Sequence, residues 1–315
     1  LGWEKMGKEN HVFAPAFKES EIGELTDICE HLVFNSFSQL EKYADFCKEK
    51  GVSIGIRVNP ECSTQGEHAI YDPCAPGSRL GVTKEVFDCE IAAEPELFEA
   101  LDGLHFHTLC ESSSYDLEKT LGEVEKRFGR FLPHIKWLNM GGGHLMTRKG
   151  YDTEHLIGLL QAFKAKYPNL EIIMEPGSAF AWQTGFLLTT VVDIVENHGI
   201  KTAIIDASFT CHMPDCLEMP YKPVIRGAIE PEEGKPVYRI GGNSCLSGDY
   251  MGDWFFEQPL KVGDKLIFED MIHYTIVKTT MFNGIPHPSL ALWSKEDRLV
   301  MYKEFGYEDY KGRMN

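Results

Sequence analysis

The chain has 315 residues, of which 43% are apolar and 25% charged, a composition that supports a buried core and excludes wholesale disorder. Its 31 Lys and Arg residues against 48 Asp and Glu residues give a net charge of −17, which argues against a nucleic-acid binder because phosphate contacts need clustered positive charge. The acidity suits a small cationic substrate, and no apolar run approaches the roughly 18–20 residues that cross a membrane.

The first half of the chain alternates strand-like and helix-like runs. Apolar strand-like runs lie at 11–15, 31–36, 52–60, 103–108, 136–143 and 170–177. Helical spacing of apolar residues is found at 19–30, 38–51, 117–131 and 153–167. Strands that alternate with helices predict parallel β/α units.

Polar or glycine-rich residues follow these strands, and ligand-handling residues at strand ends are typical of a (β/α)8 barrel. We therefore predict such a barrel, of the TIM type, over residues 1–184. An open doubly wound sheet remains the competing architecture. Six strands precede Gly177 where a closed barrel needs eight, so two βα units are expected upstream of Leu1.

Residues 185–315 have many strand-like runs and few helical patterns, which predicts a β-rich second domain, a sandwich or barrel. Its strand-like runs lie at 187–195, 201–207, 237–240, 266–270 and 274–281, and a charged loop is expected at 230–235. Nine cysteines are scattered from Cys29 to Cys245, which indicates reduced thiols, a cytoplasmic protein and no zinc pattern.

Several residues of the first domain carry possible chemistry, each with a plainer structural alternative. Gly141, Gly142 and Gly143 follow a strand, where they either approach a phosphate or form a tight turn. His105 and His107 alternate, so only one is expected to point into the barrel. Glu175 follows an apolar strand and either caps a loop or faces a cationic ring nitrogen.

Two residues of the second domain likewise have either a functional or a purely structural role. Cys245, in a polar loop that also holds Asp249, is either inert or a proton donor. Tyr274 opens the predicted strand 274–281 and precedes the turn Phe282-Asn283-Gly284. Taken singly, these residues do not select a function.

Taken in order, these motifs resemble the fold-type III pyridoxal-phosphate decarboxylases, the alanine-racemase-like enzymes that act on ornithine, arginine or diaminopimelate. Three further stretches resemble the carboxynorspermidine (carboxyspermidine) decarboxylases within that group. They are 71–82 (YDPCAPGSRLGV), 103–111 (GLHFHTLCE) and 206–223 (DASFTCHMPDCLEMPYKP). The resemblance covers essentially the whole chain.

The resemblance implies a role for each residue. His107 would stack on the pyridoxal 5′-phosphate ring, Glu175 would pair with its nitrogen, and Arg57 would lie beside it. The loop 141–143 and Tyr274 would hold the phosphate.

The substrate-side roles also follow from the resemblance. Cys245 would protonate the substrate carbon after CO2 leaves, reaching the partner's site across a homodimer interface. Glu218 would bind the distal amine of a cationic polyamine substrate, and Asp249 belongs to the same interface loop. Leu246 stands where several relatives carry an acid, which places more of the substrate's charge on Glu218.

The family's cofactor-binding lysine lies on the first barrel strand, and we expect it upstream of the given residues. A diaminopimelate- or ornithine-type decarboxylase is the nearer alternative to a carboxynorspermidine/carboxyspermidine decarboxylase. A catalytically dead homologue that binds a partner or a polyamine is the alternative from another class.

Overall fold

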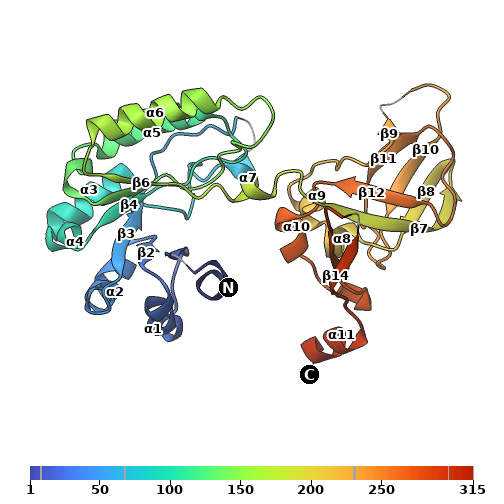
Figure 1. The fold of residues 1–315 in the computed structure, drawn as a ribbon, viewed down its shortest axis with the longest axis horizontal. Helices are drawn as coiled ribbons and strands as arrows, with labels where there is room; N and C mark the ends of the chain where they lie inside the picture. Colours follow the sequence, from blue (N-terminus) through green and yellow to red (C-terminus); the bar gives the residue numbers. More distant parts are fainter. Residues whose placement is uncertain (8, 67–68, 230–231, 297, 315) are drawn as a thin grey trace. The chain divides into compact units, whose positions relative to one another are not determined.

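The computed structural model describes residues 1–7, 9–66, 69–229, 232–296 and 298–314. The chain divides into two units, Leu1–Phe180 and Ala181–Asn315, and each is described by itself (Figure 1).

A parallel sheet forms the first unit. Within the described residues it has six strands, β1 (His11–Phe13), β2 (His31–Phe34), β3 (Ser53–Arg57), β4 (Gly103–His105), β5 (Trp137–Asn139) and β6 (Glu171–Ile173). They follow one another in the sheet in sequence order, and every neighbouring pair is parallel. A doubly wound sheet reverses its strand order at a switch point, whereas barrel strands do not, so this order favours the barrel-type arrangement.

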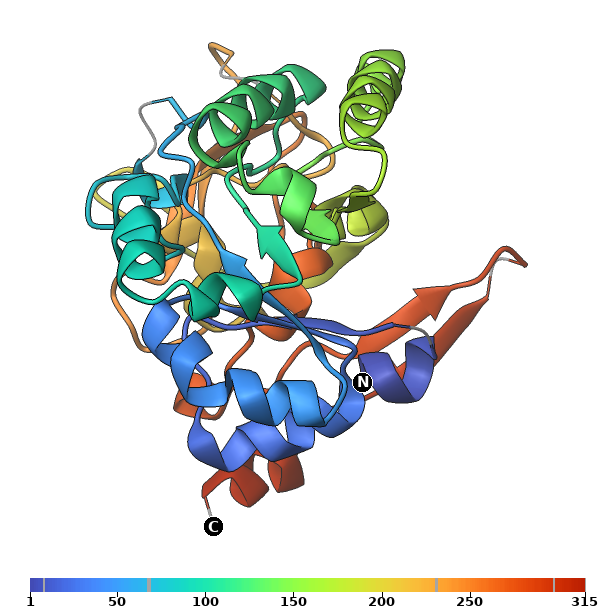
Figure 2. The ribbon, with the colours of Figure 1, turned by 90° about the vertical axis from the view of Figure 1, so that its left-hand side faces the viewer.

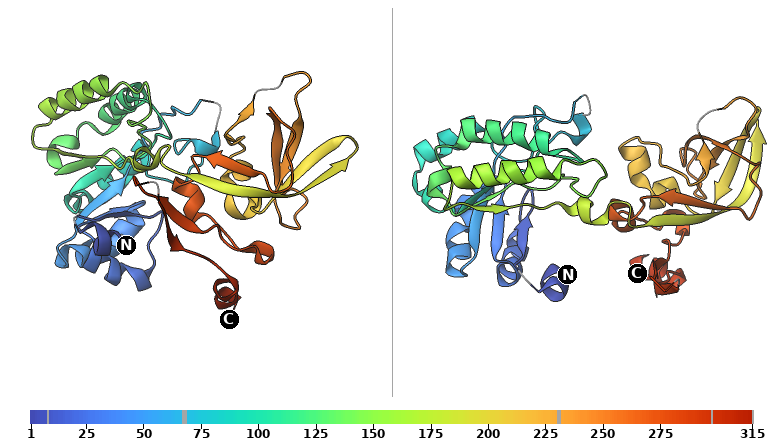
Figure 3. Two further views of the ribbon diagram at one scale, coloured as in Figure 1. Left: turned by 45° about the vertical axis from the view of Figure 1, so that its right-hand side comes forward. Right: turned by 45° about the horizontal axis from the view of Figure 1, so that its top comes forward.

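Helices connect the strands and bury one face each. They are α1 (Glu19–Ile28), α2 (Phe37–Glu49), α3 (Lys84–Ala93), α4 (Glu96–Glu99), α5 (Ser114–Phe128), α6 (Thr153–Lys166) and α7 (Gly177–Ala181), with single turns η1 (Gly2–Met6), η2 (Ala69–Tyr71) and η3 (Leu132–His134). Helix α5 begins with a capping box between Ser113 and Asp116. Helices α1 and α2 lie on the same side of their strands (Figure 2), and α5 and α6 lie side by side (Figure 3).

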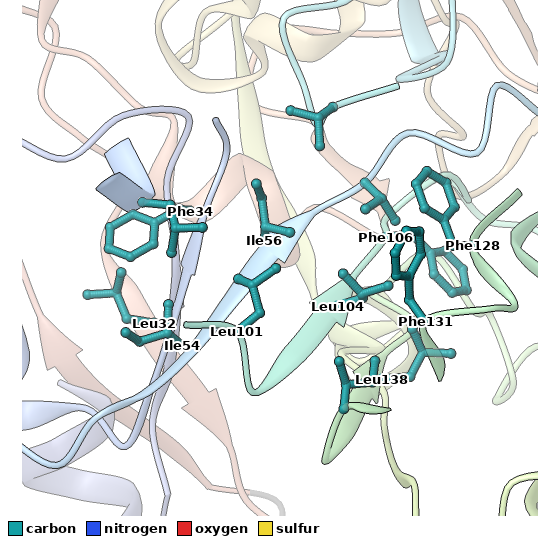
Figure 4. Close-up of a cluster of buried hydrophobic side chains, with 14 of the residues drawn as sticks. Leu32, Phe34, Ile54, Ile56, Leu101, Leu104, Phe106, Phe128, Phe131 and Leu138 are labelled. Carbon is teal, nitrogen blue, oxygen red and sulfur yellow. The ribbon is translucent and has the colours of Figure 1, made fainter. Parts of the chain in front are cut away.

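The core of this unit lies between the sheet and its helices. Leu32, Ile54, Ile56, Leu104 and Leu138 come from the strands and are fully buried. They meet aromatic rings from the helices and loops, as Figure 4 shows for Phe128 and Phe131. This packing holds the carboxyl ends of the strands in a fixed register, which positions the side chains described below.

A second sheet forms most of the second unit. Its described strands are β7 (Phe186–Asn197), β8 (Ile200–Ile205), β9 (Ala228–Ile229), β10 (Val237–Gly241), β11 (Tyr250–Phe256) and β12 (Lys265–Glu269), in the order β12-β7-β8-β10-β11-β9. All pairs are antiparallel except β8 with β10. A separate hairpin joins β13 (Leu290–Trp293) and β14 (Leu299–Lys303). Short helices complete the unit: α8 (Phe209–His212), α9 (Pro214–Glu218), α10 (His273–Val277), η4 (Phe282–Gly284) and α11 (Tyr307–Met314).

The predicted succession of parallel β/α units and a β-rich segment is confirmed. The predicted strand 274–281 is wrong, because residues His273–Val277 form helix α10. The exposed fractions of Tyr274 and Val277 are 60% and 75%, so the alternating apolar residues have no sheet to pack against. The predicted loop 230–235 begins with residues 230 and 231, which lie outside the described residues.

Two simpler observations bear on the sequence analysis. All nine cysteines lie among the described residues, and each is a free thiol. No helix in the described part of the chain is long and apolar enough to cross a membrane.

Candidate active site

A row of polar residues crosses the carboxyl ends of three neighbouring strands. Arg57 of β3 is in register with His105 of β4, which is in register with Asn139 of β5. All three side chains are buried. Glu175 lies two residues beyond β6, and its backbone N–H donates to the carbonyl of Gly141. Parallel strands therefore bring a guanidinium, an imidazole, an amide and a carboxylate to one edge of the sheet.

The Glu175 carboxylate is held by its neighbours. Asn139 Nδ2 donates to Oε1 at 2.7 Å, and His105 Nε2 lies 3.5 Å from Oε2. Burial alone would raise the pKa of Glu175, but His105, Asn139 and His107 outweigh it and lower that pKa to about 2. Glu175 is therefore ionised at neutral pH. Its side chain has Asn139 and His105 as neighbours, and its position suits the alternative in which it faces a cationic ring nitrogen.

His107 is oriented by the glycine turn. The backbone N–H of Gly142 donates to His107 Nδ1 at 3.3 Å, which leaves the ring proton on Nε2 in the neutral imidazole. Burial, together with nearby Arg57 and His105, lowers the pKa of His107 to about 4 despite the opposing effect of Glu175. At neutral pH the site presents a neutral, fixed aromatic ring.

His105 and His107, of which only one was expected to point into the barrel, both lie beside Glu175. Nitrogen atoms of both rings and an oxygen of Glu175 lie within 4.8 Å of one another. Strand β4 ends at His105, so the two-residue alternation of side chains does not continue to His107.

The turn 141–143 needs glycine because three backbones converge there. Gly141 and Gly143 have φ angles of +66° and +82°, and a Cβ at either would collide with the chain of residues 106–110. The N–H of Gly141 donates to Asn139 Oδ1, and that of Gly142 donates to His107. These two N–H groups are thus already bonded within the protein, so a tight turn accounts for their geometry without a phosphate.

Arg57 supplies a buried cation. Its Nη2 donates to the carbonyl of His107 at 2.9 Å, and its guanidinium lies 4.7 Å from the centre of the Phe13 ring. Burial lowers the pKa of Arg57 to about 10, a value that still leaves it charged at neutral pH. The guanidinium thus places a positive charge beside the His107 backbone.

The second unit carries the loop of Cys245. The exposed Cys245 donates its backbone N–H to Asn283 Oδ1 at 3.2 Å, which joins this loop to the turn η4. Asp249 is only 4% exposed. Its carboxylate accepts from Ser208 Oγ, Thr210 N and Ser244 N at 2.8, 3.0 and 3.1 Å. Asp249 therefore ties helix α8 to the loop that carries Cys245.

Glu218 and Tyr274 lie on short helices of the same unit. Glu218 is the last residue of α9, and its Oε2 forms an ion pair with Lys278 Nζ at 3.3 Å. Asp215 forms an ion pair with the same ammonium group. Tyr274 lies on α10 and its side chain is largely exposed. The predicted cation-binding acid thus already has a cationic neighbour from its own chain.

Sequence reasoning missed two residues of the first unit. It assigned no role to His105 and did not single out Asn139, although both lie beside the Glu175 carboxylate. The available signal was their position: each ends its strand, at the edge where the other site residues collect.

The side chains around Glu175 are chemically able to bind a metal ion or the ring of an aromatic cofactor. Pyridoxal phosphate has a flat ring with a protonatable nitrogen and carries negative charge. A fixed neutral imidazole, an ionised carboxylate and a buried guanidinium suit that combination. The residues present therefore fit the ring of this cofactor.

Comparison with known proteins identifies the family. The family model described as "Pyridoxal-dependent decarboxylase, C-terminal sheet domain" matches residues 33–272. The carboxyaminopropylagmatine decarboxylase of Synechocystis sp. is 48% identical, over 100% of this chain and 79% of that protein. The carboxynorspermidine/carboxyspermidine decarboxylase of Campylobacter jejuni is 43% identical, over 98% of this chain and 81% of that protein.

A solved structure agrees with these relatives. The crystal structure of carboxynorspermidine decarboxylase from Campylobacter jejuni, complexed with norspermidine, matches with a TM-score of 0.87 and 42% identity. The match covers 98% of this chain and 82% of that one. With the family model matching most of the chain, the protein belongs to the pyridoxal-dependent decarboxylases, which are carboxy-lyases.

Proposed function

We propose that this protein decarboxylates carboxynorspermidine or carboxyspermidine, giving norspermidine or spermidine and CO2 in polyamine biosynthesis. One observation carries the proposal: two relatives that match nearly the whole chain are named for decarboxylation of carboxylated polyamines or of a carboxylated agmatine derivative. The net charge of −17 supports a cationic substrate.

We further propose the architecture of the working enzyme. Residues 1–184 belong to a (β/α)8 barrel, and residues 185–315 form the β-rich domain. The sequential parallel order of β1 to β6 supports the barrel. The enzyme is a cytoplasmic homodimer in which Cys245 serves the partner's site, a proposal that rests on the family resemblance.

Pyridoxal phosphate, when bound, supplies an electron sink for the pair left behind as CO2 departs. His107 offers the face of a neutral ring to the cofactor ring, and Arg57 places positive charge beside it. Glu175, ionised at neutral pH, accepts a hydrogen bond and thereby keeps a proton on a facing ring nitrogen. The loop 141–143 and Tyr274 are proposed to contact the phosphate, the loop through Gly143, because the N–H groups of Gly141 and Gly142 are already bonded within the protein.

The remaining roles concern the substrate. The thiol of Cys245 donates the proton that replaces CO2 on the α-carbon, and Asp249 holds the loop in which that thiol lies. Glu218 binds the distal ammonium of the substrate, assisted by Asp215 on the same helix. An entering substrate cation would exchange with Lys278 at these carboxylates, because one ammonium already lies beside them.

Carboxyaminopropylagmatine is a second candidate substrate, favoured by the 48% identity to the Synechocystis enzyme. Its tail ends in a guanidinium, which forms paired hydrogen bonds with carboxylates, whereas a spermidine tail ends in an ammonium. The pair Asp215 and Glu218 suits either cation.

A competition assay tests both candidates. The native-length protein, loaded with pyridoxal phosphate, is offered carboxynorspermidine, carboxyspermidine, carboxyaminopropylagmatine, ornithine and diaminopimelate, and CO2 release is followed for each. We expect kcat/KM at least about tenfold higher for one of the first three. Higher kcat/KM for ornithine or diaminopimelate would overturn the proposal. Glu175→Gln, which removes the charge at similar size, is the control for a site-dependent reaction.

A further inference from the structure

His105 is buried in a way that leaves one polar partner within reach. Its exposed fraction is 1%, and neither Nδ1 nor Nε2 has a hydrogen-bond partner of full geometry among the described residues. Nε2 faces Oε2 of Glu175 at 3.5 Å. The ring is stacked against Phe13 with 5.4 Å between centroids. A buried imidazole with a single polar neighbour is costly unless it bonds to that neighbour.

We propose that His105 is a positioning residue that donates its Nε2–H to Glu175 Oε2 and, with Asn139 on Oε1, fixes the plane of the carboxylate. The inference rests on the proposed function, because it matters only if Glu175 faces the cofactor.

Two donors on different oxygens hold a carboxylate in a way that one donor cannot. With Asn139 alone, the Glu175 carboxylate could rotate about its last bond and keep one hydrogen bond. A second donor on Oε2 removes that freedom. Each oxygen still has a free lone pair, and the Glu175 side chain is 37% exposed, so the carboxylate remains available to a ligand.

The arrangement also requires a neutral donor. Burial lowers the pKa of His105 below its usual value, even though the hydrogen bond and charge of Glu175 oppose this shift. A neutral imidazole with its proton on Nε2 donates to Glu175 and keeps Nδ1 as the unprotonated nitrogen of the ring. The other tautomer would place two lone-pair atoms against each other.

The first test needs no cofactor. Long-range ¹H–¹⁵N spectra of the native-length, cofactor-free protein, labelled at histidine nitrogens, report the tautomer of each ring. The His105 signal is identified by its disappearance in His105→Gln. We expect a neutral ring with the proton on Nε2, and Glu175→Gln to shift that proton's resonance. A proton on Nδ1, or no response to Glu175→Gln, would overturn the inference.

The second test separates positioning from packing. His105→Phe keeps a ring beside Phe13 but has no donor, whereas His105→Gln places an amide donor near the position of Nε2. We expect His105→Phe to lower kcat about tenfold with KM changed less than about twofold, and His105→Gln to restore most of the loss. His31→Phe, at a partly buried histidine where β2 begins, near the opposite ends of the strands, is the matched control.

The outcomes distinguish the two proposals. If wild type releases no CO2 from any tested substrate, the proposed function fails, and the spectra alone decide the role of His105. If wild type is active and His105→Phe equals it in kcat, the positioning role is wrong. If His105→Gln is as impaired as His105→Phe, while both melt at the wild-type temperature, donation from His105 is also wrong.

Discussion

Two hydrogen-bonded carboxylates have different roles in the two units. Glu175 is ionised and partly exposed, so it can still meet a ligand. Asp249 is buried, and its carboxylate accepts hydrogen bonds from Ser208, Thr210 and Ser244. Burial tends to raise the pKa of Asp249, but these three donors outweigh it and lower that pKa. Because these three donors already bond to the Asp249 carboxylate, we expect it to hold the Cys245 loop in place rather than to bind the substrate.

Replacing Asp249 tests this role. Asp249→Ala leaves three donors unsatisfied in a buried place, and we expect a loss of about 3 kcal/mol in the free energy of unfolding together with a lower kcat. Asp249→Asn keeps one acceptor oxygen and should lose about half as much. Urea unfolding and steady-state kinetics measure both effects. A raised KM with unchanged stability would instead indicate direct contact with the substrate.

Lys278 offers a test of the proposed cation site. Its ammonium pairs with Asp215 and Glu218, so removing it should leave both carboxylates free for a substrate cation. We expect Lys278→Met to lower KM for the preferred polyamine substrate a few-fold at low salt, with little change in kcat. Lys278→Arg, which keeps the charge, is the control. An unchanged KM in Lys278→Met would mean that Glu218 does not meet the distal cation.

At the scale of elements, strong periodicity made the strands and long helices predictable. The runs at 31–36, 153–167 and 170–177 contain β2, α6 and β6. Helix α3 was missed because Phe87 is its one buried residue, which leaves little apolar periodicity to detect. His105 was misjudged for a related reason: the point where β4 ends depends on its neighbours in the sheet, and a two-residue alternation does not encode it.

Two glycines in adjacent strands make room for one tryptophan. Gly55 of β3 and Gly103 of β4 lie beside the Trp137 indole, and a Cβ at either position would overlap its ring. Trp137 is 2% exposed, and its Nε1 donates to Ser53 Oγ at 2.9 Å. The sheet at this point is therefore shaped around a single large side chain.

Alanine at matched glycines tests this packing. We expect Gly103→Ala to lower the free energy of unfolding by about 1–3 kcal/mol, because neither the indole nor the strand can move freely. Gly122→Ala is the control, on the exposed face of α5 with open space around its Cβ, and should add about 0.5–1 kcal/mol. Thermal melts measure both. Equal stability of Gly103→Ala and wild type would mean that Trp137 repacks without cost.

At the scale of the whole molecule, neutral histidines with little access to solvent link stability to pH in both units. His107 in the first unit and His212 in the second have pKa values lowered to about 4. For His212, burial and nearby His287 lower the pKa, and the carboxylates of Asp249 and Asp206 oppose them. Such groups bind a proton more readily in the unfolded chain, where the usual pKa is 6.5.

The sign of the pH effect follows from that difference. Above about pH 6.5 neither the folded nor the unfolded chain protonates His212, so the full stability is present. As the pH falls toward about 4, the unfolded chain takes up the proton first, and each such histidine lowers the free energy of unfolding by up to about 3 kcal/mol.

His212→Asn, whose Oδ1 can accept from Ser208 N in place of Nδ1, should weaken this loss of stability in the second unit. His198→Asn, at an exposed histidine of the same unit, shows whether removing any imidazole has that effect. Urea unfolding from about pH 7.5 to about pH 4.5 measures the slope. A slope for His212→Asn equal to that of wild type would mean that His212 is already protonated in the folded protein or is not buried there.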